Sequence, residues 1–148
     1  MAHRTHRRQA LGRGIALVAG VAASPLVRGQ TLAPAPPVPE RRWYEAALAM
    51  RRLAESWGDQ AYGAVLVLDG GLVGEGPSRV VRSGDPAAHA EREAIRDAQR
   101  RLGRTALAGS VLYSTSRPCA ACEAAAAQAG VERMFHGAEL RDAGRPGV

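Results

Sequence analysis

The chain contains two cysteines, Cys119 and Cys122, which lie three residues apart directly after Pro118. An alanine-rich stretch of helical character follows, so both sulfurs fall on the first turn of a helix, whose N-terminus favours their anionic form. Such a pair can be a redox couple, a structural disulfide or half of a metal site. A thioredoxin-type pair is expected after the first strand of its domain, usually beside an aromatic residue. This pair comes late in the chain and follows Ser116-Arg117-Pro118, which favours the metal site.

A third metal ligand is available upstream, in the sequence His89-Ala90-Glu91. Catalytic zinc takes three protein ligands and keeps one position for water, and one histidine with two cysteines meets that need. Two helix N-termini directed at the centre would offset the negative charge that two thiolates bring. Glu91 can move protons between a metal-activated water and a substrate nitrogen. Its spacing alone leaves the role of a fourth ligand open.

These side chains need a framework, which the apolar periodicity predicts. Helical spacing predicts three helices, over residues 43–57, 89–102 and 119–129. Short apolar runs predict four strands, over residues 64–68, 72–75, 110–115 and 131–135. The first two strands are expected to form a hairpin, and the last two, joined through a helix, are expected to run parallel. The order indicates an α/β domain with helices packed on a mixed sheet.

The pattern His-x-Glu followed by Pro-Cys-x-x-Cys is the signature of zinc nucleobase deaminases. Further segments add to it, namely residues 63–67, 74–76, 85–91, 112–115 and 118–122. Over about residues 43 to 138 the chain resembles the cytidine and deoxycytidylate deaminase superfamily, most closely its branch of tRNA adenosine deaminases and bacterial guanine deaminases. The resemblance implies a three-layer α/β/α sandwich over residues 40–148. It also implies a zinc-dependent hydrolase that removes the exocyclic amine of a nucleobase or nucleoside and releases ammonia.

The resemblance assigns roles to individual positions. It implies zinc ligation by His89, Cys119 and Cys122, proton transfer by Glu91, and substrate contacts from Ala64 through its backbone, from Ser78 and from His89. Two positions depart from the family pattern, because Ser78 stands where Asn is common and Arg117 stands where this branch usually has Glu. The sequence also ends shortly after the fourth strand, without the C-terminal helix that covers the pocket in relatives. We therefore expect an open pocket, or one that a second copy covers in a homodimer.

The distribution of charge argues against a nucleic-acid partner. All twenty basic residues are arginine, and five of them precede residue 30, where there is no acidic residue. The other 15 arginines stand against 14 acidic residues, so the body of the chain is nearly neutral. Neutralising many phosphates requires a strongly basic surface. We therefore expect a small-molecule base or nucleoside as the partner.

Two alternatives to a deaminase stay open. A zinc-stabilised but catalytically degenerate deaminase-like domain could serve binding; the departures at Ser78 and Arg117 favour it and the intact Glu91 disfavours it. A redox protein could use Cys119 and Cys122, although His89 and Glu91 would then have no purpose.

Residues 1–29 have the composition of an export signal. A basic segment up to Arg13 precedes an uncharged run over residues 14–27, and a Pro-rich linker follows over residues 30–39. The uncharged run is shorter than the roughly 20 residues that a membrane-spanning helix needs, so we expect no stable membrane span. The doublet Arg7-Arg8 before that run resembles a twin-arginine leader. The expected location of the mature protein is periplasmic or secreted.

Three kinds of residue are expected to be structural or solvated. Trp43 and Trp57 share one face of the first helix and are expected to anchor it in the core. Arg79 and Arg82 flank the loop near the expected pocket, where the solvated surface is favoured over a phosphate contact. His136 is expected to face solvent at the end of an edge strand.

Overall fold

The computed structural model describes residues 37–147. Its helices are α1 (Arg41–Ser56), α2 (Val80–Ser83), α3 (Ala90–Leu102) and α4 (Ala120–Ala129). Its strands are β1 (Gly63–Leu68), β2 (Gly71–Pro77), β3 (Val111–Ser114), β4 (Arg133–His136) and β5 (Arg141–Gly144). The expected leader and most of the Pro-rich linker lie outside the described residues. Within the described part, no helix has the length and apolar character that crossing a membrane requires.

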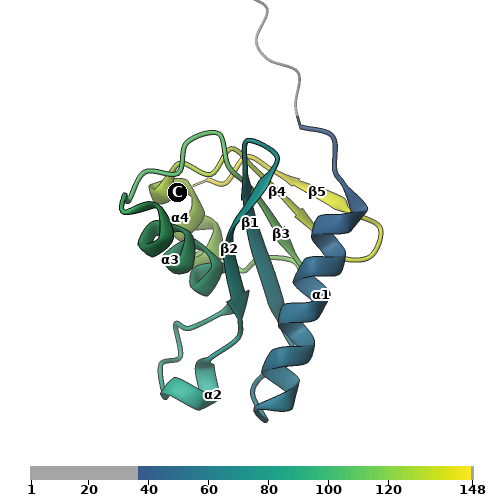
Figure 1. Ribbon diagram of the computed structural model, residues 1–148, viewed down its shortest axis with the longest axis vertical. Helices are drawn as coiled ribbons and strands as arrows, with labels where there is room; N and C mark the ends of the chain where they lie inside the picture. The colour runs from purple at the N-terminus through teal and green to yellow at the C-terminus, as the bar shows by residue number, and fades with distance from the viewer. Residues whose placement is uncertain (1–36, 148) are drawn as a thin grey trace, which may run out of the picture. The chain divides into compact units, whose positions relative to one another are not determined.

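The strands form one mixed sheet in the order β2-β1-β3-β4-β5. β1 pairs antiparallel with β2 as the expected hairpin, and antiparallel with β3 on its other side. β3 and β4 run parallel, as the helix between them predicts. Helix α1 covers one face of the sheet, and α3 and α4 cover the other (Figure 1). The predicted α/β/α sandwich with a mixed sheet is therefore confirmed.

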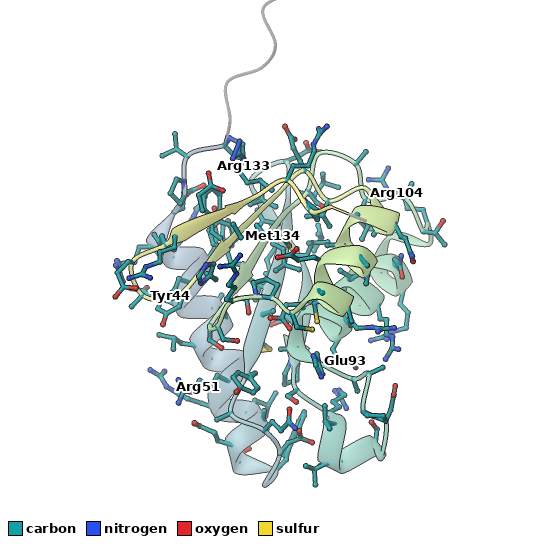
Figure 2. The ribbon with its side chains drawn as sticks, turned by 180° about the vertical axis from the view of Figure 1, so that it is seen from behind. Tyr44, Arg51, Glu93, Arg104, Arg133 and Met134 are labelled. Carbon is teal, nitrogen blue, oxygen red and sulfur yellow. The ribbon has the colours of Figure 1, made fainter. Side chains whose placement is uncertain are left out.

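Two apolar clusters hold the three layers together. On the side of α3 and α4, Leu66 and Leu112 of the sheet pack with Ile95 and Met134. Figure 2 shows Met134 within the molecule and Arg104 at its periphery. On the side of α1, the buried residues are Ala47, Val65, Val67, Val111, Tyr113 and Phe135. Burying apolar side chains on both faces fixes the sheet between the helices.

Helix α3 lies unusually close to β2, and this contact sets the position of the His89-Ala90-Glu91 segment. A Cβ atom added at Gly76 would collide with the carbonyl oxygen of Ala90, and one added at Gly74 would collide with that of Ala94. Only glycine allows the helix backbone to approach the strand so closely. The glycines thus place the first turns of α3 directly against the edge strand β2.

Two elements were not expected from the sequence, and one of them corrects the position of His136. β5 pairs antiparallel with β4, so β4 is an inner strand and His136 is only partly exposed. Burial, together with the positive charges of Arg117 and Arg141, lowers the pKa of His136. In β5, apolar and polar side chains do not alternate, and α2 has only four residues. Neither element therefore carries a periodic signal in the sequence.

The expectation for Trp57 is also wrong. Trp43 packs against the core cluster on the α1 side, whereas Trp57 follows the last residue of α1 and leaves the apolar stripe. The guanidinium carbons of Arg79 and Arg82 lie 4.9 and 4.6 Å from the centre of its ring. Cation–π stacking from both arginines therefore holds Trp57.

Candidate active site

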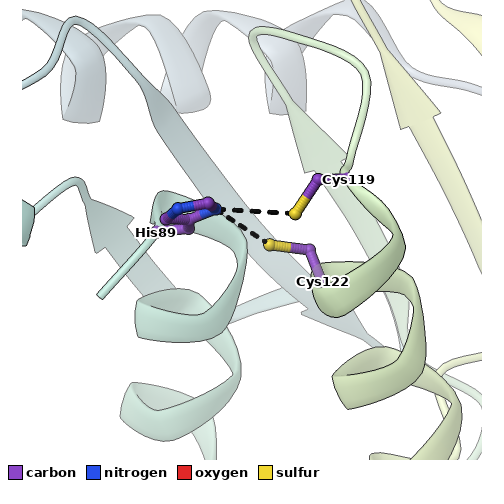
Figure 3. Close-up of side chains that lie close together, drawn as sticks. All are labelled: His89, Cys119 and Cys122. Carbon is purple, nitrogen blue, oxygen red and sulfur yellow. Dashed lines mark hydrogen bonds between the residues drawn. The ribbon is translucent and has the colours of Figure 1, made fainter. Parts of the chain in front are cut away.

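The two helices that face the same side of the sheet bring the predicted metal ligands together at their N-termini. His89 is the N-cap residue of α3 and Cys119 is the N-cap residue of α4, and neither side chain caps its own helix. Histidine and cysteine are poor N-cap residues compared with Ser, Thr, Asp or Asn. Their side chains point instead toward each other and toward Cys122 on the first turn of α4 (Figure 3).

The distances between these donor atoms fit a tetrahedral zinc ion. His89 Nδ1 lies 3.6 Å from Cys119 Sγ and 3.5 Å from Cys122 Sγ. Zinc bound at about 2.3 Å to sulfur and about 2.05 Å to nitrogen, at a tetrahedral angle, would separate the nitrogen from each sulfur by about 3.6 Å. All three donor atoms lie within 4.8 Å of one another. One imidazole and two sulfurs also form a donor set that binds zinc in preference to calcium or magnesium.

The environment of Cys122 disfavours a thiolate unless a cation is bound nearby. This side chain is fully buried, and burial followed by the charge of the Glu91 carboxylate raises the pKa of its thiol far above the ordinary value. A thiolate beside a carboxylate is costly in a buried place unless a positive charge compensates it. A metal ion provides that charge, and the N-terminus of α4 adds to it.

Glu91 lies beside the donor group, and its carboxylate is held by a hydrogen bond from Ser114. Its side chain is 5% exposed on the first turn of α3. Oε1 accepts a hydrogen bond of 2.8 Å from the hydroxyl of Ser114, and Oε2 accepts one of 3.6 Å from the thiol of Cys122. Among the described residues, the compact group of metal donors contains His89, Cys119 and Cys122 and does not contain Glu91. The arrangement therefore favours a proton-transfer position for Glu91 over a fourth ligand.

A cavity of about 250 Å³ opens onto this group. Its wall includes His89, Glu91 and Cys119, together with Gln60, Tyr62, Ser116 and Arg117. A neighbouring hollow of about 610 Å³ shares Gln60, Tyr62 and Ser116 with it. Tyr62, which lines both hollows, is 46% exposed to solvent.

Of the three residues expected to contact the substrate, one lines the cavity and two do not. His89 lines the cavity, whereas Ala64 and Ser78 are buried outside its lining. Ala64 pairs with Gly76 and Ser114 inside the sheet. Roles for Ala64 and Ser78 in substrate binding stay predictions.

The hydroxyl of Ser78 is directed to Asp59 and fixes a loop. It donates a hydrogen bond of 2.9 Å to Asp59 Oδ1, while the backbone N–H groups of Gln60 and Arg82 donate to the same carboxylate. Burial raises the pKa of Asp59, but these hydrogen bonds lower it by more, and the net shift is downward. Asp59 thereby ties Gln60, a residue of the cavity wall, to Ser78 and to Arg82 of helix α2.

Sequence reasoning missed three residues of the cavity wall and one beside Glu91. Gln60 and Tyr62 lie in the loop between α1 and β1, which carries no chemical motif, so only the tertiary structure reveals them. Ser116 stands just before the Arg-Pro-Cys segment, and its nearness to the cysteines was an available signal. Ser114 lies on a strand that was expected only as part of the sheet.

Comparison with known proteins agrees with this site. Residues 38–138 match the family described as the cytidine and deoxycytidylate deaminase zinc-binding region, and the chain belongs to that family. The zinc-binding region expected from the sequence is thereby confirmed, with His89, Cys119 and Cys122 as its candidate ligands.

Relatives of known activity come from the branch that the sequence resembles. The chain is 42% identical over 86 residues to a guanine deaminase of Bacillus subtilis, a match that covers 58% of this chain and 55% of that protein. It is 40% identical over 95 residues to a tRNA-specific adenosine deaminase of Agrobacterium fabrum, covering 64% of this chain and 62% of that protein. The chain thus spans little more than half of the length of these relatives.

Solved structures give the same assignment. A tRNA:A34 deaminase structure aligns with a TM-score of 0.64 at 38% identity, over 66% of this chain and 71% of that one. The guanine deaminase structure from Bacillus subtilis aligns with a TM-score of 0.64 at 33% identity, over 68% of this chain and 65% of that one.

Proposed function

We propose that the protein is a zinc-dependent hydrolytic deaminase of a nucleobase or nucleoside, which releases ammonia. One observation carries the proposal: the carboxylate of Glu91 and the donor residues His89 and Cys119 line the same cavity. A metal site meant only for stability is typically closed by four protein ligands, whereas three ligands beside an open cavity leave a position for reaction.

The chain's own residues can perform the proton transfers of such a reaction. His89, Cys119 and Cys122 would hold the zinc ion, which when bound would supply the Lewis acidity that makes water nucleophilic near neutral pH. Glu91 accepts the proton that this water gives up and delivers it to the ring nitrogen next to the amine-bearing carbon. Once the oxygen of that water has bonded to the amine-bearing carbon, Glu91 would move the second proton of the former water to the amine. The carbon–nitrogen bond then breaks, which leaves a carbonyl on the ring and releases ammonia.

The size of the cavity supports a small substrate. Its volume of about 250 Å³ lies just below the range of about 300–1,000 Å³ that is usual for small-molecule sites. The shared residues Gln60, Tyr62 and Ser116 connect it to the wider hollow, which gives room for a sugar beyond the base. The nearly neutral charge of residues 30–148 also favours a free base or nucleoside over tRNA. A homodimer that covers the open side stays a prediction.

Ammonia release tests the proposal. The purified zinc-loaded protein is incubated with guanine, adenine, cytosine, their nucleosides and an adenosine-containing tRNA anticodon stem-loop. We expect ammonia from at least one base or nucleoside and none from the stem-loop. Activity on the stem-loop alone would contradict the substrate class, and a zinc-loaded protein inactive on all of them would favour the binding domain.

We also propose export through the twin-arginine route. The doublet Arg7-Arg8 before the uncharged run supports it, and this route carries proteins that are already folded. A thiolate site loaded with metal before export would be protected from disulfide formation outside the cytoplasm. Replacing both arginines by lysine should leave the precursor inside the cell, still zinc-loaded, and continued export of that variant would refute the route.

A further inference from the structure

A buried serine of the sheet contacts the proposed proton-transfer group. Ser114 is the last residue of β3, is 0% exposed, and pairs with Ala64 on β1 and with His136 on β4. Its hydroxyl donates the 2.8 Å hydrogen bond to Glu91 Oε1. The same hydroxyl oxygen accepts a hydrogen bond of 3.4 Å from the backbone N–H of Ser116.

This chain of hydrogen bonds connects two segments of the site. Ser116 lines the cavity and stands in the loop that leads to Cys119, while Glu91 stands on α3. The strand that leads to the cysteines therefore also contacts the acid-base residue on the neighbouring helix. Because Ser114 pairs with strands on both sides and is fully buried, its backbone gives the hydroxyl a fixed point of attachment within the sheet.

A glutamate at this position needs such a fixed point. The Glu91 side chain is 5% exposed, so solvent has little access to hold its carboxylate in place. Its other oxygen lies 3.6 Å from Cys122 Sγ, at the edge of the metal donor group. Rotation about the side-chain torsions would turn the carboxylate away from the cavity or into the donor group, and proton transfer requires hydrogen-bond reach of the reacting atoms.

We propose that Ser114 is a positioning residue, whose hydroxyl holds Oε1 of Glu91 and so keeps the carboxylate oriented for proton transfer in the cavity. The inference rests on the proposed deaminase function and adds a residue to its machinery. Ser114 would act through Glu91, since it belongs neither to the lining of the cavity nor to the group of metal donors.

The kinetic test compares three variants of the full chain on the substrate that gives ammonia. A hydrogen bond to a charged acceptor typically favours the bonded orientation by a factor of about 10 to 100 in the equilibrium constant. We therefore expect Ser114→Ala to lower kcat about 10-fold or more, while KM changes by less than about twofold and the zinc-to-protein ratio stays at that of the wild type. Ser114→Thr keeps the hydroxyl and should restore most of kcat.

Ser110→Ala is the matched control. Ser110 is also fully buried and directly precedes the same strand, and its hydroxyl has no hydrogen-bond partner among the described residues. Removing that hydroxyl should leave kcat, KM and zinc content unchanged. An equal loss of kcat in Ser110→Ala and Ser114→Ala would show a general effect of buried serines and overturn the proposal.

A second readout does not depend on activity. Crystal structures of the zinc-loaded wild type and of Ser114→Ala should differ in the Glu91 side chain, which is expected to rotate or to occupy several rotamers in the variant. An unmoved Glu91 or an unchanged kcat in Ser114→Ala overturns the inference while leaving the deaminase proposal intact. Absence of ammonia release by the wild type would instead refute the deaminase proposal itself.

Discussion

Removing one metal ligand should lower the thermal stability by an amount that depends on free zinc. The folded protein assembles the candidate ligands His89, Cys119 and Cys122 at the N-termini of α3 and α4, whereas the unfolded chain has no assembled site. At free zinc about 100 times above Kd, binding stabilises the folded state by about 2.7 kcal/mol. With an unfolding entropy of roughly 2.1 cal/mol/K per residue over about 110 ordered residues, this corresponds to about 12 °C in Tm.

The assay is the shift of Tm that a zinc chelator causes, measured by calorimetry. We expect the wild type to lose about 12 °C on chelation under those conditions, and His89→Ala to show almost no shift. His136→Ala is the matched control, because His136 lies on β4 outside the donor group and this variant should keep the full chelator shift. A full chelator shift in His89→Ala would refute the ligand assignment.

Three further predictions concern Glu91, the contact of α3 with β2, and Asp59. Glu91→Gln should keep zinc, as metal analysis would show, but lower kcat by about 10² to 10⁴-fold, and loss of zinc would instead make Glu91 a ligand. Gly76→Ala should destabilise the fold by about 1–3 kcal/mol in denaturant titration, because its Cβ collides with α3, while Gly71→Ala on the same strand should be tolerated. Hydrogen bonding lowers the pKa of Asp59, so its contribution to stability is present above about pH 3.9 and is lost as pH falls through the folded-state pKa. The gap in unfolding free energy between wild type and Asp59→Ala should therefore narrow below about pH 4, and a gap that widens would contradict this.

The positions of the metal ligands could be predicted because local signals place them. His89 and Cys119 each directly precede a helix whose end is marked by a glycine, and the apolar stripe of α3 shows which of its faces packs on the sheet. Once both helices lie on one face beside neighbouring strands, their N-termini meet at one edge. Motif and periodicity together thus locate the donor group.

The surroundings of the site could not be predicted because they depend on contacts between distant segments. The hydrogen bond from Ser114 to Glu91 spans 23 residues, and the one from Ser78 to Asp59 spans 19 residues. Nothing in the local sequence tells whether a buried hydroxyl faces a cavity or another side chain. The edge strand β5 was missed for a different reason, since its residues are stabilised by backbone pairing and an exposed ion pair between Arg133 and Asp142.

The central claim, hydrolytic deamination at the zinc site, is tested most directly by the fate of oxygen and nitrogen in the reaction. The zinc-loaded protein is incubated with the panel of bases and nucleosides in water labelled with heavy oxygen, and the product is analysed by mass spectrometry beside an ammonia assay. We predict one ammonia for each product molecule and one labelled oxygen on the carbon that carried the amine. A zinc-loaded protein that releases no ammonia and labels no product from any of these compounds would contradict the account.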